Sequence, residues 1–226
     1  MNRLVANALG AAGAWLLESP AEPAMGPTPA ARARPVVAVF GLAPGCGATV
    51  VARALAAELG ARDPRGAAAV GCDAPGAGLA LATAAAGRLA RVLADVPGAH
   101  TRAVGRLCLV GGADPLALAD CCRHHAPLVV DAGSGALGGR AAVVADATVL
   151  VASPSSEPAL AAVAAACIAG VGPEPVTVVN GAVSARTGLS LPRSRVGAGL
   201  ALAGREPPGE AGRTLARLAD LVEEAS

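Results

Sequence analysis

The chain has 226 residues and a formal net charge of +1, and 54% of its residues are hydrophobic although only 1% are aromatic. Such a length suits one α/β domain with a core of small aliphatic side chains, and it leaves little room for a second domain. The balanced charge gives no global electrostatic reason to expect a nucleic-acid partner, and the absence of lysine excludes mechanisms that need an ammonium side chain.

The N-terminal segment, residues 1–18, predicts a peripheral helix. Its apolar run, Leu4 to Leu17, is shorter than the about 20 residues that a helix needs to span a bilayer. The apolar positions recur at helical spacing, at Leu4, Val5, Ala8, Leu9, Ala12, Trp15 and Leu16. We expect this helix to dock on protein. Because Arg3 is the only cation nearby, membrane contact through residues 3–17 would be at most peripheral, and the core of a signal peptide is the alternative.

Six cysteines are spread over predicted strands, helices and one glycine loop, which is not the spacing of a small secreted disulfide framework. They are Cys46, Cys72, Cys108, Cys121, Cys122 and Cys167. We therefore expect reduced thiols and a cytoplasmic protein. Cys121 and His125 share a helical face, but a zinc site needs three or four converging ligands, so no zinc is expected.

Residues 19–34 are rich in proline and alanine without periodicity, which predicts a linker before a domain at residues 35–226. In this domain apolar runs of strand length alternate with alanine-rich helical stretches. This pattern is typical of a mostly parallel, twisted sheet in a three-layer α/β sandwich. Strands are predicted at Val36–Phe40, Ala67–Cys72, Arg106–Val110, Leu128–Asp131, Thr148–Ala152 and Val176–Asn180. Helices are predicted at Thr49–Leu59, Leu79–Ala94, Pro115–His124, Glu157–Ala169 and Glu210–Glu224.

A glycine loop, residues 41–49, joins the first predicted strand to the first predicted helix of the domain. It reads Gly-Leu-Ala-Pro-Gly-Cys-Gly-Ala-Thr. Loops of this kind let backbone N–H groups converge on an anion at the positive end of a helix, and glycine permits the close approach. The loop therefore predicts a phosphate site, and a tight turn without a ligand is the alternative.

The same loop also matches the dinucleotide turn of short-chain dehydrogenases. Gly41, Gly45 and Gly47 supply the glycines, and Asp73 follows the second strand, where it would hold a ribose hydroxyl. Those dehydrogenases use a tyrosine and a lysine for their chemistry. The chain contains neither residue, which excludes dehydrogenase chemistry of that kind.

Four segments, in the same order, resemble the MinD/ParA ATPases, a family with a P-loop NTPase-like fold. Residues 43–50 resemble the deviant phosphate loop K-G-G-x-G-K-T-T, and residues 128–133 are similar to the strand, aspartate and small residues of Walker B and switch II. Residues 146–158 resemble the strand and loop that follow, and residues 176–180 the strand whose last asparagine meets adenine. The loop itself is most similar to the atypical pilus-assembly subgroup of CpaE and TadZ, which tends to read G-x-G-A-[ST].

The resemblance implies ATP and Mg²⁺ as ligands. Thr49 would bind Mg²⁺, Asp131 would support the ion through water, and Asp73 would be the switch I aspartate, so that Asp73 and Asp131 are the candidate catalytic residues. The nucleotide would contact Gly45, Cys46, Gly47, Ala48, Thr49, Val50, Asn180 and Pro192. Turn or cap roles are the alternative for Asp73, Asp131 and Asn180.

Two alanines stand where the family has lysine. Ala48 replaces the lysine that pairs with the β- and γ-phosphates, and Ala43 the lysine that reaches the nucleotide of a dimer partner. A charge-assisted hydrogen bond contributes about 1.5–3 kcal/mol and a helix N-terminus alone about 0.3–1 kcal/mol, so we expect weak ATP binding. A cation on the transferred phosphoryl group contributes on the order of 10³–10⁵ in rate, so we expect slow hydrolysis or none. Arg53 follows Thr49 by one helical turn, and its side chain is expected to point away from the loop.

These residues predict a degenerate nucleotide-binding protein that acts as a positioning, assembly or regulatory factor, as a homodimer or with another protein. The alternatives are an active ATPase whose cation comes from an arginine or a partner, and an interaction domain that binds no nucleotide. Three arginines, Arg186, Arg193 and Arg195, flank the predicted site. We interpret them as solvated loop residues, with contact to phosphate, DNA or a partner as the alternative.

Overall fold

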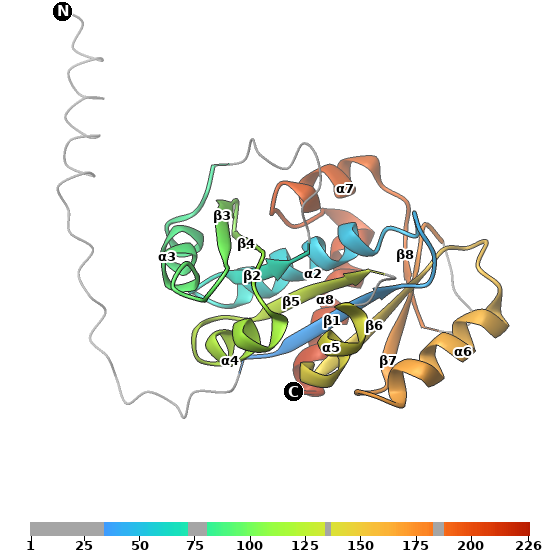
Figure 1. Cartoon of the computed structure of the whole chain (residues 1–226). Coiled ribbons are helices and arrows are strands. Elements are labelled where there is room, and N and C mark those ends of the chain that lie inside the picture. Colours follow the sequence, from blue (N-terminus) through green and yellow to red (C-terminus); the bar gives the residue numbers. More distant parts are fainter. Residues whose placement is uncertain (1–33, 72–80, 134–136, 183–187) are drawn as a thin grey trace, which may run out of the picture. The chain divides into compact units, whose positions relative to one another are not determined.

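An eight-stranded sheet forms the centre of the domain in the computed structural model (Figure 1). The structure describes residues 34–71, 81–133, 137–182 and 188–226. The strands are β1 (Val36–Gly41), β2 (Ala67–Val70), β3 (His100–Val104), β4 (Leu107–Gly111), β5 (Leu128–Gly133), β6 (Ala147–Ala152), β7 (Pro175–Asn180) and β8 (Leu189–Leu191). The helices are α2 (Ala48–Arg62), α3 (Ala84–Leu93), α4 (Pro115–His125), α5 (Leu137–Val144), α6 (Pro158–Ala169), α7 (Arg195–Leu202) and α8 (Gly209–Glu224).

The strand order places β1 in the middle of the sheet. It is β3-β4-β2-β5-β1-β6-β7-β8, and every neighbouring pair is parallel except β3 and β4, which form an antiparallel hairpin. The chain leaves β1 towards β2 on one side, whereas β6 and β7 lie on the other. In open α/β sheets ligands bind at such a reversal, at the carboxyl ends of the strands.

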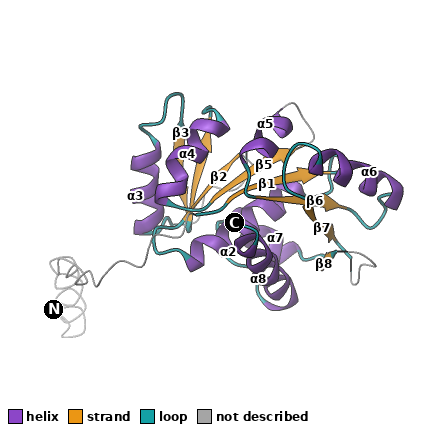
Figure 2. Ribbon diagram, turned by 90° about the horizontal axis from the view of Figure 1, so that it is seen from below, coloured by secondary structure: helices purple, strands orange, loops and turns teal. Residues whose placement is uncertain are grey.

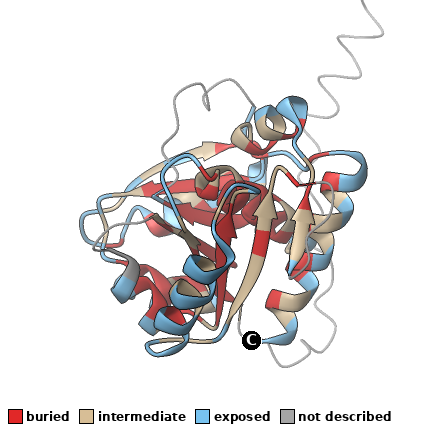
Figure 3. Cartoon of the chain, turned by 90° about the vertical axis from the view of Figure 1, so that its right-hand side faces the viewer, coloured by how far each residue is buried: buried red, intermediate tan, exposed pale blue. Residues whose placement is uncertain are grey.

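Two helical layers cover the sheet (Figure 2). Helices α2, α7 and α8 pack on one face together with Val37 and Val39 of β1. Helices α3, α4 and α5 pack on the other face with Val36 and Ala38. Because successive side chains of a strand point to opposite faces, one apolar run supplies both cores. Figure 3 shows the buried residues gathered in the central strands and on the inner sides of the helices.

The predicted α/β sandwich with a mostly parallel sheet is confirmed, and several elements differ from the prediction. The helix predicted from Leu79 begins only at Ala84, because the side chain of Thr83 caps it by accepting a hydrogen bond from Ala86 N at 3.2 Å. The second strand ends at Val70 and not at Cys72. The sequence did not predict β3, β8, α5 or α7.

The predicted N-terminal helix and most of the predicted linker, residues 1–33, lie outside the described residues. Within the described part of the chain, no helix combines the length and the apolar character needed to cross a bilayer.

Candidate functional site

The loop after β1 turns the chain into α2 through two left-handed glycines. Gly45 and Gly47 have φ values of 79° and 88°, which strain any residue with a Cβ. Gly47 is also the N-cap of α2 and offers its first N–H groups no side-chain acceptor. These donors therefore remain for a ligand at the positive end of the helix. A cavity of about 240 Å³, the loop cavity, lies here and is lined by Gly41, Ala43, Pro44, Gly45, Cys46, Gly47, Ala48, Thr49, Val50, Asp131 and Gly133.

Asn180, the last residue of β7, holds the loop in place. Its Nδ2 donates to the carbonyl oxygen of Cys46 at 2.9 Å. The contact is close enough that a Cβ added at Gly47 would lie 2.2 Å from this nitrogen. The glycine at position 47 is thus required both by its backbone conformation and by the approach of the amide.

The side chains of Thr49 and Asp131 meet inside the loop cavity. Thr49 Oγ1 donates to Asp131 Oδ2 at 2.5 Å, and Gly133 N donates to Asp131 Oδ1 at 3.2 Å. Burial raises the pKa of the Asp131 carboxyl above its ordinary value, while the two hydrogen bonds oppose that shift. The aspartate at the end of β5 and the first turn of α2 therefore form one polar centre.

The donor chemistry of this pair fits Mg²⁺. The ion prefers hydroxyl and carboxylate oxygens, and it usually takes only one or two carboxylates and completes its shell with water and substrate phosphates. Thr49 and Asp131 provide one hydroxyl and one carboxylate beside the phosphate loop. The described residues contain no group of three or more His, Cys, Asp or Glu side chains that would hold a metal on their own.

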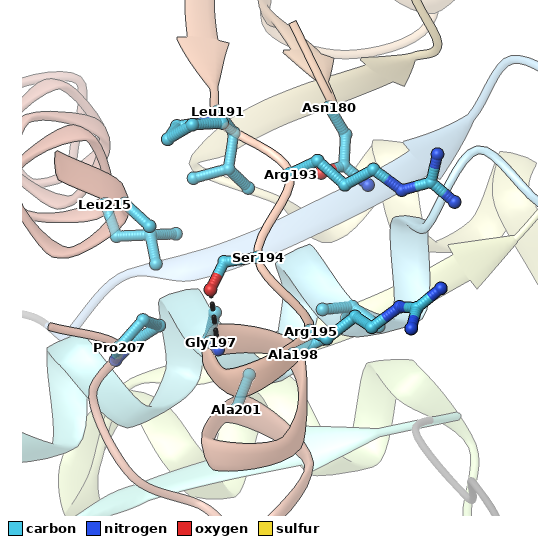
Figure 4. Close-up of a pocket in the computed structure, with 14 residues that line it drawn as sticks. Asn180, Leu191, Arg193, Ser194, Arg195, Gly197, Ala198, Ala201, Pro207 and Leu215 are labelled. Atoms are coloured by element: carbon cyan, nitrogen blue, oxygen red, sulfur yellow. Dashed lines mark hydrogen bonds between the residues drawn. The ribbon is translucent and has the colours of Figure 1, made fainter. Parts of the chain in front are cut away.

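A second cavity of about 210 Å³, the apolar cavity, lies between α2, α7, α8 and the end of β8 (Figure 4). It is lined by Val50, Ala54, Asn180, Leu191, Pro192, Arg193, Ser194, Arg195, Gly197, Ala198, Ala201, Pro207, Ala211 and Leu215. Leu191, Pro207 and Leu215 lie on one side, whereas Asn180 and the two arginines lie on the other. The cavity is therefore apolar on one wall and polar on the opposite wall.

The loop cavity and the apolar cavity adjoin each other. Val50 lines both of them, and Asn180 lines the apolar cavity while its amide bonds to the loop. A ligand with an anionic end and an apolar, ring-sized body matches this combination, because polar groups orient it and the apolar wall buries its body.

Most of the predicted site residues converge on this place. Residues 45–50 and Asp131 line the loop cavity, and Asn180 and Pro192 line the apolar cavity. Asp73 lies outside the described residues. Arg53 is fully buried in α2 and is not among the residues that line the loop cavity.

Sequence reasoning did not assign the apolar wall. Leu215 belongs to an apolar stripe of α8 that indicates only packing on the core, and nothing in its local sequence shows that it borders a cavity. The sequence predicts Arg193 and Arg195 to be solvated loop residues, whereas both line the apolar cavity. The five described cysteines are free thiols, and burial raises the pKa of the Cys122 thiol to about 12.

Comparisons with known proteins agree with this geometry at the level of the fold. No protein-family model and no curated protein sequence matches the chain. Among solved structures, the chain is similar to a ParA family ATPase from Chlorobium tepidum TLS, with a TM-score of 0.57 and 16% identity over 83% of this chain and 98% of that one. It is also similar to the cell division ATPase MinD of Pyrococcus furiosus, with a TM-score of 0.57 and 16% identity over 84% of this chain and 98% of that one. The domain therefore has the fold of the MinD and ParA ATPases.

Proposed function

We propose that this protein binds an adenine nucleotide with Mg²⁺ weakly, hydrolyses it slowly or not at all, and acts through protein contacts as a positioning, assembly or regulatory factor. The nucleotide part depends on one observation, the loop cavity and the apolar cavity that adjoin at Val50. The loop also carries the G-x-G-A-T sequence expected of a CpaE/TadZ-like, degenerate member of the fold.

Each wall of the site has a part in the proposed binding. The first N–H groups of α2 donate to phosphate oxygens, as at other helix N-termini that follow glycine loops. Thr49 and Asp131 would hold Mg²⁺, which supplies charge neutralisation on the phosphates when it is bound. Asn180 uses Nδ2 on the Cys46 carbonyl, so its Oδ1 is left to accept from a ligand amine. Leu191 and Leu215 bury the base.

Slow or absent hydrolysis follows from the lining of the loop cavity. All of its described lining residues are uncharged apart from Asp131. A transferring phosphoryl group needs positive charge nearby, and one such cation contributes on the order of 10³–10⁵ in rate. The residues that line the loop cavity bind and orient a ligand, and none of them places a cation on the transferring phosphoryl group.

The protein-contact part is supported by helix α6. The helix has no charged side chain, yet eight of its twelve residues are exposed. Leu160 and Val163 are 54% and 61% exposed, and exposed apolar surface of this kind marks interaction sites. We propose that this helix contacts a second copy of the chain or another protein.

Titration calorimetry with MgATP and MgADP, followed by a phosphate-release assay, tests the nucleotide part. We expect weak binding without appreciable turnover. Ala48→Lys restores the missing lysine, and about one charge-assisted hydrogen bond should tighten ATP binding roughly 10- to 150-fold. Ala117→Lys, an exposed position on α4, is the matched control and should not change it. Fast turnover by the unmodified protein would establish the active ATPase instead, and no heat with any variant would establish an interaction domain without nucleotide.

Light scattering across a concentration series tests the contact through α6. We expect Leu160→Glu and Val163→Glu to lower the molar mass of the assembly or to abolish binding of a partner. Leu116→Glu, on the exposed side of α4, carries the same change at a distant place and should have no effect. If the α6 variants and the Leu116→Glu control lose assembly alike, the assignment of the contact to α6 is contradicted.

A further inference from the structure

We infer that Arg193 and Arg195 supply the positive charge that the phosphate loop lacks, so that the site takes nucleoside di- and triphosphates by their phosphates as well as by their base. This inference rests on the proposed function and deepens it. The inference differs from the prediction that these arginines are solvated loop residues, and it is supported by the position of their two side chains beside the apolar cavity.

Arg193 lies in the turn between β8 and α7, and Arg195 is the first residue of α7. This turn is tied at both ends. At the start, Leu191 pairs with Asn180 of β7, and Gly181 N donates to the Leu191 carbonyl at 2.7 Å. At the end, Ser194 Oγ accepts from Gly197 N at 2.9 Å and caps α7. The turn is therefore a built part of the domain, and it fixes the backbone from which the two side chains project.

The extended backbone at Ser194 sends the two arginines to the same side. Its φ and ψ of −139° and 112° are those of a strand, in which residues i and i+2 share a side while the residue between them points the other way. Ser194 turns towards α7, and Arg193 and Arg195 extend together on the side of the apolar cavity where Asn180 lies (Figure 4). Asn180 in turn bonds to the phosphate loop.

Neither guanidinium group has a hydrogen bond or ion pair with a described residue. Some arginines of the described chain are engaged, as Arg62 is with Glu58, Asp220 and Glu223, whereas Arg193 and Arg195 are not, and only these two line the apolar cavity. The Arg193 and Arg195 forks therefore have their donors left for a ligand. A guanidinium matches phosphate with two parallel hydrogen bonds, which a lysine cannot do.

Arg193 and Arg195 supply the cationic side chains that the loop cavity lacks. The loop provides backbone donors and one carboxylate, and the adjoining cavity provides an apolar wall and two cations. A ligand with a base and at least two phosphate charges uses all of these groups, whereas an uncharged nucleoside uses only the apolar wall.

ADP titration at about 50 and 200 mM salt tests the inference with two matched double variants. Arg193→Ala with Arg195→Ala should weaken ADP binding about 10- to 100-fold, and it should make binding less dependent on salt, because fewer charges contact the phosphates. Arg213→Ala with Arg217→Ala removes the same charge from exposed positions of α8 and should leave affinity within about threefold. Since Arg193 and Arg195 are exposed, the unfolding temperature of the first variant should match that of the unmodified protein.

The outcomes separate this inference from the proposed function. If the unmodified protein binds no nucleotide, the proposed function fails and this inference fails with it. If it binds ADP and the Arg193/Arg195 variant binds ADP equally well, or if both double variants lose affinity alike, only the arginine assignment is overturned. If the alanine variant does not fold, Arg193→Lys with Arg195→Lys replaces it: a loss of at least threefold at unchanged salt dependence supports the paired contact, and unchanged affinity overturns it.

Discussion

Gly47→Ala should destabilise the domain more than any other single methyl group added to the phosphate loop. Gly47 has a φ of 88°, and an alanine in left-handed backbone costs about 1–2 kcal/mol. The new Cβ would lie 2.2 Å from Asn180 Nδ2, so the amide must move and its hydrogen bond to Cys46 is lost, at about 0.5–1.5 kcal/mol. The sum is a loss of about 1.5–3.5 kcal/mol in the free energy of unfolding, measured by urea denaturation at an unchanged m-value.

A double-mutant cycle divides this loss into its two causes. Asn180→Ala removes the amide that the new methyl group would meet. In that background Gly47→Ala should cost only the backbone share, about 1–2 kcal/mol, which gives a coupling energy of about 0.5–1.5 kcal/mol. Gly87→Ala is the control, since Gly87 lies inside α3 with no atom within 4 Å of an added Cβ, and it should stabilise by about 0.5–1 kcal/mol. A loss below about 0.5 kcal/mol for Gly47→Ala, or additive effects in the cycle, would refute the reasoning.

Three further measurements follow from the same geometry. Thr49→Val should lower stability by about 0.5–1.5 kcal/mol in urea denaturation and should weaken the dependence of ADP affinity on Mg²⁺, because it removes the hydroxyl that bonds Asp131. Burial raises the pKa of the Asp131 carboxyl above its ordinary value of 3.8. A group whose pKa is higher in the folded state stabilises that state at pH values below the unfolded pKa, and this stabilisation is lost as pH rises through the folded pKa. Asp131→Asn should therefore gain stability relative to the unmodified protein as pH rises from the ordinary carboxyl pKa through the raised pKa of Asp131, and a difference that does not change with pH would contradict the assignment. Iodoacetamide at pH 8 should modify the exposed Cys167 before the buried Cys108 and Cys122, because burial raises the pKa of both buried thiols to about 12 and the thiolate is the reactive form. Mass spectrometry of the labelled peptides would show the order.

The sequence predicted the elements that carry long apolar runs and missed those stabilised by tertiary contacts. Strand β3, at the edge of the sheet, alternates between exposed and partly buried residues. Because it includes polar Thr and Arg side chains, its sequence has no apolar run that would distinguish it from a loop. Helix α7 contains Gly197 and Gly199, which lower helix propensity. The cap at Ser194 requires glycine at position 197, because an added Cβ there would lie 3.0 Å from Ser194 Oγ. Propensity alone therefore does not predict α7, in which the cap requires glycine at position 197 whereas a Cβ added at Gly199 would meet no atom within 4 Å.

In the candidate site too, some residues could be predicted from the local sequence and others only from the fold. Its phosphate loop is recognisable because glycine spacing encodes local backbone geometry, and Asp131 at the end of β5 is predicted from the resemblance of residues 128–133 to Walker B. The apolar wall arises where α7 and α8 meet β8, and those elements lie far from the loop in sequence. Only the fold brings Leu215 of α8 and Val50 of α2 to one cavity.

The bonds within the loop also bear on how a chain without lysine would bind a nucleotide. Asn180 Nδ2 donates to the Cys46 carbonyl, and Thr49 Oγ1 donates to Asp131, so the protein itself fixes the middle and the end of the loop. A site that is already ordered loses less conformational entropy when a ligand binds, and this saving increases affinity without any new contact. The absent lysines remove charge, which two arginines beside the site can return, whereas the shape of the loop depends on glycine and asparagine. Changes at Gly47 or Asn180 should therefore weaken binding of ADP at every salt concentration, and changes at Arg193 and Arg195 mainly at low salt.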